Sequence, residues 1–297
     1  MMEGEDDSIQ HWAEFWNASV QKSEVVTDDM QAARWNEMAE GFGRNMDGER
    51  RQKRMAGLLE LLRDAGFSVE GAIVLDIGCG PGALSIPLAR AGAKVTSLDI
   101  ATGMLDRLRG TAKDEKLDIT PVECSWWSAD IDQLGFRNAF DLVIASSTPA
   151  IKDAETFDRM MACSKKFCYY NGFIGGNPRL APERKPLAEV FGFDERKGHA
   201  FGPGGRGAHG GPGLLFPFMY LYMQGIRPVI RFNHRARPEQ DWNEAAKKAI
   251  ERFSRTRELN QQQKETVRNY YNEIAVDGKV KHEPGALSAM MIWSVQN

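Results

Sequence analysis

The chain has 297 residues, 42% of them hydrophobic and 27% charged, which is the composition of a folded globular protein and excludes an intrinsically disordered chain. Its formal net charge of −3 excludes a strong overall positive field, so neither nucleic acid nor an anionic membrane is an expected partner. The longest apolar run, residues 214–223, is too short for a membrane-spanning helix, which needs about 20 residues. We therefore predict no membrane span.

The first ten residues are acidic and contain no apolar segment, so no targeting signal is predicted and a cytoplasmic location is expected. The four cysteines form no Cys-x-x-Cys pair, which argues against a disulfide framework and a structural zinc site, and no metal is expected. We expect a monomer or a homodimer.

Strands and helices alternate through the first half of the chain. Residues 1–50 are expected to form a helical cap, and apolar residues at helical spacing predict a helix at 55–62. A continuous apolar run between glycines, 71–78, is typical of a strand buried on both faces of a parallel sheet. The alternation continues with predicted helices at 83–91, 103–110 and 153–165 and predicted strands at 94–100, 118–124, 140–146 and 166–174. This order predicts an α/β fold with a doubly wound, mostly parallel sheet.

The regular pattern ends at Gly175. Residues 175–225 are rich in glycine, proline and arginine and are predicted to be an irregular insertion that forms an acceptor pocket. Strands at 226–232 and 286–295 and helices at 239–254 and 264–275 are predicted after it. The predicted domains are therefore a cap at 1–50, a core at 51–174, the insertion at 175–225, and a segment at 226–297 that completes the sheet.

A turn with three glycines joins the first predicted core strand to the next helix. It reads GCGPGA over residues 78–83, and Asp99 follows about 20 residues later at the end of the next strand. Glycine permits a tight turn and a close approach of the backbone to a ligand, and the helix N-terminus offers free N–H groups. An acid at the end of the second strand can accept hydrogen bonds from a ribose diol. The pattern predicts a site for a nucleoside-containing cofactor.

Asp76 distinguishes between such cofactors. It lies two residues before Gly78, on the same side of the strand end. A carboxylate there would repel the pyrophosphate of NAD or FAD and would favour a ligand whose reacting end is cationic. S-adenosylmethionine carries a sulfonium and an ammonium group, and it is the predicted cofactor.

With these residues in place, the chain resembles the class I S-adenosylmethionine-dependent methyltransferase family over about residues 30–175. The segment VLDIGCGPG is similar to the first motif of the family, VTSLDI to its second-strand acidic motif, SWWSADIDQL to its adenine-contacting segment, and FDLVIASSTPA to its fourth-strand motif. The resemblance implies a Rossmann-like sheet of seven strands with an antiparallel last strand.

The resemblance also implies roles for individual residues. Asp76 would lie near the amino group of the methionine part, and Gly78 and Gly80 would give the backbone clearance that the ligand needs. Asp99 would bind the ribose hydroxyls, and Asp130 would accept a hydrogen bond from the exocyclic amine of the adenine.

Ile100 would pack on the adenine, and Trp35 would belong to an N-terminal lid over the cofactor. Ser146 and Ser147, at the end of the fourth strand, would face the methyl group or the acceptor, with Ser146 also touching the cofactor. Three further residues complete the implied cofactor site: Cys79, Met104 and Ile131.

The sequence identifies the acceptor less closely. The fourth strand ends in Ser146-Ser147-Thr148-Pro149, which disfavours the amines of nucleic-acid bases and glutamine amides as acceptors. The leading hypothesis is a small-molecule acceptor, with His209 of the insertion as a candidate base. Trp126 and Trp127 are candidates for stacking on a ligand or for packing inside the protein.

Three other functions stay open. The first is an RNA or protein methyltransferase, for which the basic runs 49–54 and 231–237 would have to lie on one face beside the pocket. The second is a non-catalytic protein that binds S-adenosylmethionine. The third, a dehydrogenase, is supported by the glycine pattern and Asp99 and opposed by Asp76.

Overall fold

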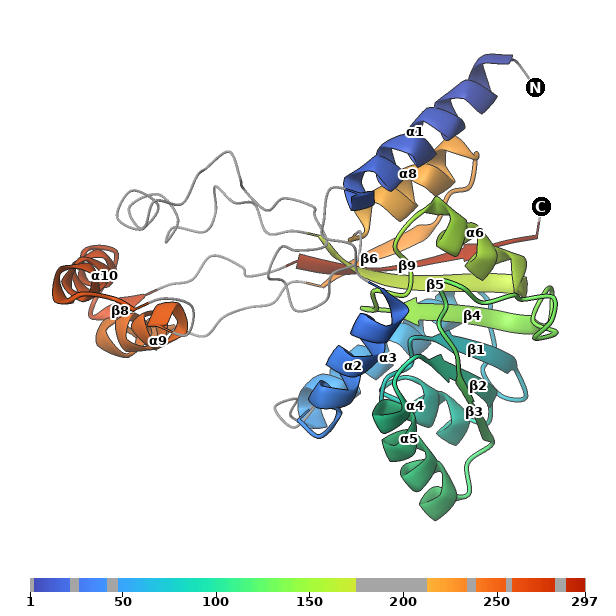
Figure 1. Cartoon of the computed structure of the whole chain (residues 1–297), viewed down its shortest axis with the longest axis horizontal. Coiled ribbons are helices and arrows are strands. Elements are labelled where there is room, and N and C mark those ends of the chain that lie inside the picture. The colour runs from blue at the N-terminus through green and yellow to red at the C-terminus, as the bar shows by residue number, and fades with distance from the viewer. Residues whose placement is uncertain are drawn as a thin grey trace. The chain divides into compact units, whose positions relative to one another are not determined.

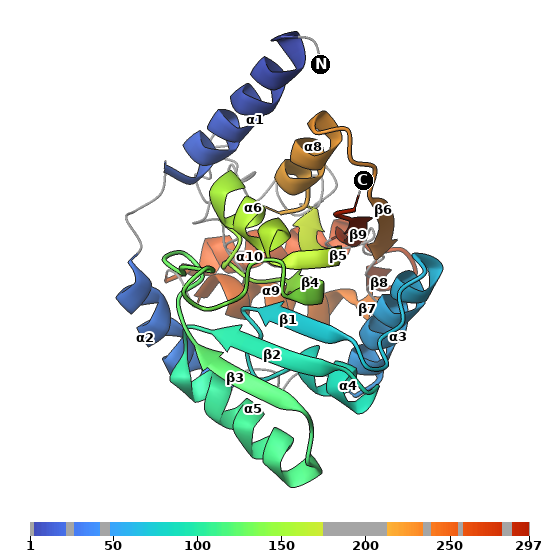
Figure 2. The same cartoon turned by 90° about the vertical axis from the view of Figure 1, so that its right-hand side faces the viewer.

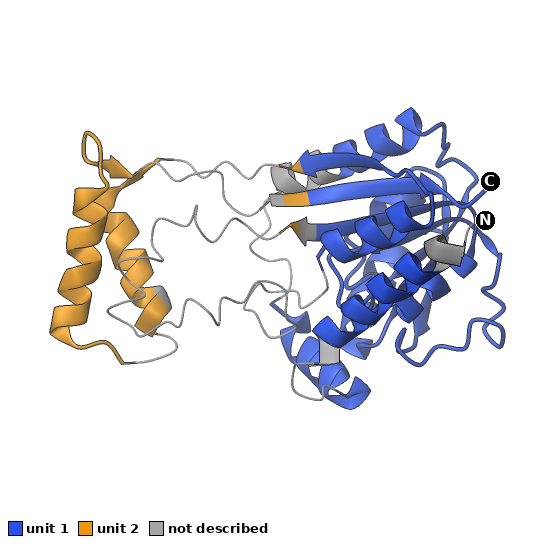
Figure 3. Cartoon of the chain, turned by 90° about the horizontal axis from the view of Figure 1, so that it is seen from above, with its two compact units in different colours: residues 1–173, 201–232, 289–297 blue, residues 174–200, 233–288 orange. Residues whose placement is uncertain are grey.

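A computed structural model describes residues 3–21, 27–41, 48–174, 213–233, 239–254, 258–280 and 287–296. The chain divides into two compact units (Figure 3). The first consists of residues 1–173, 201–232 and 289–297, and the second of residues 174–200 and 233–288. The predicted site residues that the structure describes all lie in the first unit.

The first unit is built on a seven-stranded sheet of order β3-β2-β1-β4-β5-β9-β6. Figure 2 shows β3, β2, β1 and β4 side by side in this order. The strands are β1 (Ile73–Ile77), β2 (Lys94–Asp99), β3 (Ile119–Glu123), β4 (Phe140–Ser146), β5 (Ser164–Ile174), β6 (Val229–Asn233) and β9 (Leu287–Ser294). The predicted α/β fold with seven sheet strands is confirmed.

The pairing places β1 between β2 and β4. It pairs in parallel with β2 on one side and with β4 on the other, so that Asp76 lies opposite Ser97 and Ile144. Strands β2 and β3, and β4 and β5, are also parallel. The Val295 N–H at the end of β9 donates to the Lys166 carbonyl at the beginning of β5, so β9 runs antiparallel to β5. The predicted antiparallel last strand is therefore present.

Helices cover both faces of this sheet. They are α1 (Glu3–Gln21), α2 (Asp28–Ala39), α3 (Gly48–Asp64), α4 (Ser85–Arg90), α5 (Thr102–Glu115), α6 (Ala154–Ala162) and α8 (Leu215–Met223). On one face, apolar residues of α3 and α4, among them Leu62 and Leu88, pack with Val74, Ile144 and Tyr169 of the strands. Burial of this apolar surface is the main favourable free energy of the first unit.

An aromatic cluster forms on the opposite face. Phe157 of α6 contacts Trp16 of α1 at a ring-centroid distance of 5.7 Å, Tyr170 of β5 at 6.1 Å and Trp293 of β9 at 5.4 Å. Figure 1 shows α1, α6 and α8 lying together there. Tyr169 and Tyr170 are both buried, because successive strand residues point to opposite faces.

The insertion was predicted to be irregular throughout, and this is wrong for its last part. Residues 215–223 form α8, whose Phe216, Pro217, Tyr220 and Leu221 are buried. An almost uniformly apolar helix lacks the alternation of polar and apolar residues by which helices are found in a sequence. Residues 175–212 lie outside the described ranges.

The second unit contains two helices and a short ribbon. Helix α9 (Trp242–Ser254) packs against α10 (Gln261–Glu273), and strands β7 (Gln240–Asp241) and β8 (Lys279–Val280) pair antiparallel. Its buried core is Ala245, Ala246, Ala249, Leu259, Val267, Tyr270, Tyr271 and Val280. The predicted helices at 239–254 and 264–275 are thus confirmed with shifted starts. Among the described residues, no helix is long and apolar enough to cross a membrane.

Candidate functional site

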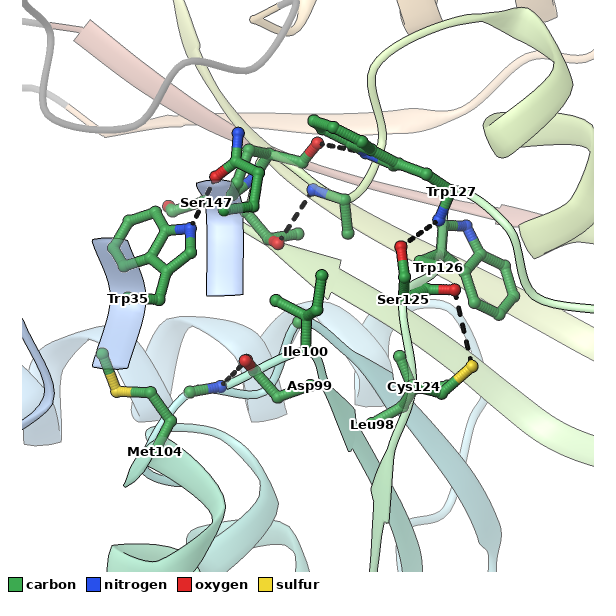
Figure 4. A pocket seen from close by; sticks show the side chains of 16 residues that line it. Trp35, Leu98, Asp99, Ile100, Met104, Cys124, Ser125, Trp126, Trp127 and Ser147 are labelled. Carbon is green, nitrogen blue, oxygen red and sulfur yellow. Dashed lines mark hydrogen bonds between the residues drawn. The ribbon is translucent and has the colours of Figure 1, made fainter. Parts of the chain in front are cut away.

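A pocket lies at the carboxyl ends of β1, β2, β3 and β4 (Figure 4). This is where the strand order reverses, the usual ligand position in an open α/β sheet. Helices α2 and α5 supply the remaining wall. The lining residues are Gln31, Trp35, Gly78, Gly80, Leu98, Asp99, Ile100, Met104, Cys124, Ser125, Trp126, Trp127, Ser147, Thr148, Pro149 and Ala150.

The glycine turn after β1 forms one side of this pocket. Gly78 has a φ of +65° and Gly80 a φ of +55°, a region that residues with a Cβ rarely adopt. The Gly78 and Cys79 N–H groups donate to the Leu98 carbonyl at 2.8 and 3.0 Å. A Cβ on Gly78 would lie 2.0 Å from the Thr148 hydroxyl oxygen. Only glycine fits here, because both its backbone conformation and its packing against the loop after β4 exclude a side chain.

Asp99 at the end of β2 ties the turn to the next loop. Its Oδ2 accepts from the Gly80 N–H at 2.8 Å, and its Oδ1 accepts from the Ala101 N–H at 2.9 Å. The side chain is 8% exposed, and burial raises the pKa of this carboxyl even though the backbone N–H groups oppose the rise. An ionised carboxylate has about four lone-pair directions, so Asp99 keeps acceptor capacity for a ligand in the pocket.

Asp76 is not on the pocket wall. It is 2% exposed and accepts from the Ser85 hydroxyl at 2.6 Å, and the Ser97 hydroxyl donates to Ser85 at 2.8 Å. This buried network joins β1, β2 and the start of α4. The Asp76 carboxylate is therefore a buried acid near the pocket that does not line it, and its direct contact with a ligand stays a prediction.

Trp35, Ile100 and Met104, all predicted site residues, lie on the pocket wall. The Trp35 Nε1–H donates to the Gln31 Oε1 at 3.0 Å, one helical turn earlier. Figure 4 shows Trp35 across the pocket from Trp127, with Ile100 and Asp99 below. These side chains make the pocket largely apolar.

Helix α2, which carries Trp35, is held over the pocket by hydrogen bonds to two other segments. The Gly103 N–H of α5 donates to the Asn36 Oδ1 at 2.8 Å, and the Arg107 guanidinium donates to the Ala39 carbonyl. At its other end, Asp28 accepts from the Ser128 hydroxyl at 3.0 Å. Helix α2, the second helix of the predicted cap, is thus anchored near both of its ends.

The segment after β3 supplies the wall opposite α2 through its two tryptophans, which the sequence analysis named as candidates for stacking or packing. Trp126 and Trp127 both line the pocket. Asp130 is exposed, and its Oδ1 accepts from the N–H groups of Asp132 and Gln133 at 3.0 Å each. Neither Asp130 nor the buried Ile131 is on the wall, so their contacts with a ligand stay predictions.

Ser147 lines the pocket where β4 ends, whereas Ser146 does not. Ser147 has a φ of +53°, and its hydroxyl donates to the Asn171 Oδ1 at 2.9 Å while its N–H donates to the Asn171 carbonyl at 2.8 Å. Asn171, on β5, is 3% exposed. These bonds hold Ser147 in an unusual backbone conformation that points to a local function.

Cys79, another predicted residue, is not on the wall. Cys79 is buried in the turn, and burial, together with the charges of Asp76 and Asp99, raises the pKa of its thiol well above the ordinary value. Cys79 therefore stays a protonated thiol that packs inside the turn. His209 lies outside the described residues. Within the described ranges, no group of three His, Cys, Asp or Glu side chains could hold a metal ion.

The sequence analysis missed several lining residues. Leu98, Cys124, Ser125 and the residues 148–150 all stand at the ends of predicted strands, and the rule that ligands bind at the carboxyl ends of parallel strands could have found them. Gln31 lies four residues before Trp35 on one helix face, which is also a usable signal. Asn171 gives no such signal, because its role depends on the pairing of β4 with β5.

Replacing Gly78 by alanine is expected to destabilise the protein more than replacing Gly71. Both have positive φ, +65° and +74°, so both variants carry the cost of about 1–2 kcal/mol of a left-handed alanine. Nothing lies within 4 Å of a Cβ on Gly71, whereas a Cβ on Gly78 meets Thr148. Overpacking should add about 1–3 kcal/mol in Gly78→Ala. Urea unfolding of both variants measures the difference, and equal losses would contradict the close approach.

Part of the chain matches known proteins in sequence. Residues 74–167 match the model of a family described as a methyltransferase domain. An uncharacterized protein of Haemophilus influenzae is 33% identical over 138 residues, 45% of this chain and 47% of that protein. A ubiquinone biosynthesis O-methyltransferase of Bordetella avium is 34% identical over 115 residues, 36% of this chain and 44% of that protein. The chain matches less than half the length of these relatives.

A solved structure has the same fold. The crystal structure of magnesium protoporphyrin IX methyltransferase from Synechocystis, with bound S-adenosylhomocysteine, superimposes with a TM-score of 0.52 and 14% identity, covering 90% of this chain and 98% of that one. At this identity the likeness concerns the fold alone. The family match covers β1 to the beginning of β5, the strands whose ends form the pocket. By the family match and the sheet order, residues 74–167 form a methyltransferase domain of the class I, S-adenosylmethionine-dependent type.

Proposed function

We propose that this protein transfers the methyl group of S-adenosylmethionine to a small-molecule acceptor. The observation that carries the proposal is one pocket that joins the glycine turn, the buried carboxylate of Asp99 and the end of β4. Gly78 and Gly80 bring the backbone of the turn to the pocket wall with no side chain between it and a ligand, and the apolar walls suit an adenine ring. The residues present therefore fit this cofactor.

Each part of the pocket has a role in this proposal. Asp99 accepts hydrogen bonds from the ribose hydroxyls, Ile100 and Met104 pack against the adenine, and Gly78 gives clearance at the methionine end. The buried charge of Asp76, close to the turn, favours a cationic ligand over a pyrophosphate. Ser147 stands where the acceptor enters. The negative charges at the turn are the feature that opposes NAD.

The reaction needs little acid or base chemistry from the wall. The bound cofactor supplies a methyl group on a positively charged sulfur, a good leaving group in an in-line displacement. The described lining residues include no histidine, lysine or arginine. Their contribution is to orient the two reactants and to exclude water, through Trp35, Trp127 and Pro149. A base, for which His209 is the candidate, is required only for an acceptor that must lose a proton.

A small-molecule acceptor is supported by the name of the relative from Bordetella avium. The cypemycin N-terminal methyltransferase of a Streptomyces species is 38% identical over 78 residues, 26% of this chain and 29% of that protein, and its name favours a peptide amine as the second candidate. The cytoplasmic location and the monomeric or homodimeric state stay predictions.

Calorimetric titration tests the cofactor. We expect S-adenosylhomocysteine and S-adenosylmethionine to bind, NAD not to bind, and Asp99→Asn to weaken binding about 10- to 100-fold, because a hydrogen bond to a charged group contributes about 1.5–3 kcal/mol. Asp106→Asn is the matched control, since Asp106 is an exposed acid on α5 outside the pocket. Binding of NAD in place of both methionine derivatives would contradict the proposal.

Turnover with methyl-labelled S-adenosylmethionine tests the acceptor class. The protein is incubated with the low-mass fraction, the RNA and the protein of a cell extract in separate reactions. We expect label in the low-mass fraction, and less of it with Asp99→Asn. Label in protein would replace the small-molecule proposal with a peptide or protein acceptor, and label in RNA would replace it with an RNA acceptor. No transfer to any fraction would favour a non-catalytic binding protein.

Cofactor affinity is expected to fall on acidification earlier than for an ordinary carboxylate. Asp99 must be ionised to accept from both ribose hydroxyls, and burial raises its pKa, so affinity is lost as the pH falls through that raised value. The stability of the free protein changes with pH in the opposite direction. Asp99 favours folding at low pH, and this contribution is lost as the pH rises through its raised pKa. Titrations from pH 7 downward on wild type and Asp99→Asn measure the effect, and an equal slope in both would contradict it.

A further inference from the structure

Arg159 of α6 binds the backbone of the pocket wall from outside the pocket. Its Nη1 donates to the carbonyls of both Trp126 and Trp127, the second at 3.2 Å, and its Nη2 donates to the Glu155 Oε1 at 2.7 Å. The Arg159 side chain is 15% exposed, and its guanidinium carbon lies 6.0 Å from the Trp126 ring centroid. Arg159 is not a lining residue.

The first turn of α6 holds the same segment by a second route. The Trp126 Nε1–H donates to the Thr156 carbonyl at 3.0 Å, and Thr156 is 1% exposed. Thr156 and Asp153 form the capping box that begins α6. The Trp127 Nε1–H donates to the Pro149 carbonyl at 3.2 Å, in the loop after β4. Both indoles and both carbonyls are therefore fixed to neighbouring elements.

This anchoring matters because residues 124–127 lie in neither a strand nor a helix. The Cys124 N–H donates to the Asp99 carbonyl at 3.0 Å, and beyond this bond a connecting segment of this kind is mobile unless side chains bind its backbone. The two N–H groups of Nη1 bind the two adjacent carbonyls while Nη2 binds Glu155, and the planar guanidinium holds these donors in a fixed geometry that a flexible lysine ammonium lacks. Arg159 is thus suited to fix the conformation of this wall.

We propose that Arg159 is a positioning residue for the nucleoside half of the cofactor. It holds residues 124–127 in the conformation against which the adenine packs, and it does so without touching the ligand. The inference rests on the proposed cofactor site. It adds α6, which the pocket itself does not include, to the elements that determine cofactor affinity.

The test compares Arg159→Met with Glu155→Gln. The first removes the bonds to both carbonyls, and the second changes only the outer partner, which is 78% exposed. Calorimetry with S-adenosylhomocysteine and with 5′-methylthioadenosine, at a temperature where circular dichroism shows each variant folded, gives the two affinities. We expect Arg159→Met to lose about tenfold in both, about 1.4 kcal/mol, and Glu155→Gln to stay within about twofold of wild type.

The equal loss for the two ligands separates positioning from general loosening. 5′-Methylthioadenosine lacks the amino-acid part, so a general loosening of the site would weaken S-adenosylhomocysteine more. Unchanged affinities in folded Arg159→Met, an equal loss in Glu155→Gln, or a loss confined to S-adenosylhomocysteine would each overturn the inference. If Arg159→Met does not fold, Arg159→Lys decides, with a smaller equal loss expected and no loss overturning it. Failure of wild type to bind either ligand would instead overturn the proposed function.

Discussion

The pocket depends on the close approach of two loops at the centre of the sheet. Because β1 pairs with β2 on one side and β4 on the other, the chain leaves β1 directly beside the end of β4. There, the backbone of Gly78 takes the space that a side chain would need next to Thr148. The hydrogen bond from Gly80 to Asp99 then fixes the turn to β2. The strand order and the absence of a side chain at Gly78 together allow the two loops that line the pocket to pack against each other.

Buried acids set the electrical character of the pocket. Asp76 is satisfied by the Ser85 hydroxyl, and Asp99 by two backbone N–H groups, so both can be buried at a tolerable desolvation cost. The N–H groups of Gly78, Cys79 and Gly80 in the turn already donate to the Leu98 carbonyl and to Asp99, so they are not free to bind a pyrophosphate. The turn has the sequence of a general nucleotide site, but its neighbours restrict the ligand.

How much of this could be predicted from the sequence differs between strands and loops. The five strands before the insertion and the position of Asp99 follow from local patterns, because apolar runs and glycine spacing depend on nearby residues, whereas Ile100 and Met104 came only from the resemblance to the family. For the wall after β3, the sequence offered Trp126 and Trp127 for stacking or for packing and could not decide between the two. Five residues, 124–128, connect the end of β3 to Ala129 and Asp130. This connection brings Trp126 and Trp127 to the pocket, while Asp130 caps an exposed turn. This placement depends on tertiary contacts with α6.

The two halves of the pocket are consequently held by different means. The glycine turn and Asp99 are fixed by backbone hydrogen bonds between β1 and β2, which tolerate few changes of sequence. The outer walls are fixed by side chains: Asn36 on α2 and Arg159 on α6 each bind a backbone group of another segment. Side-chain anchors can be replaced one at a time without altering the sheet. The motifs contain the glycine turn and Asp99 and none of these side-chain anchors, which is why they identify the class of cofactor more closely than the outer walls or the acceptor.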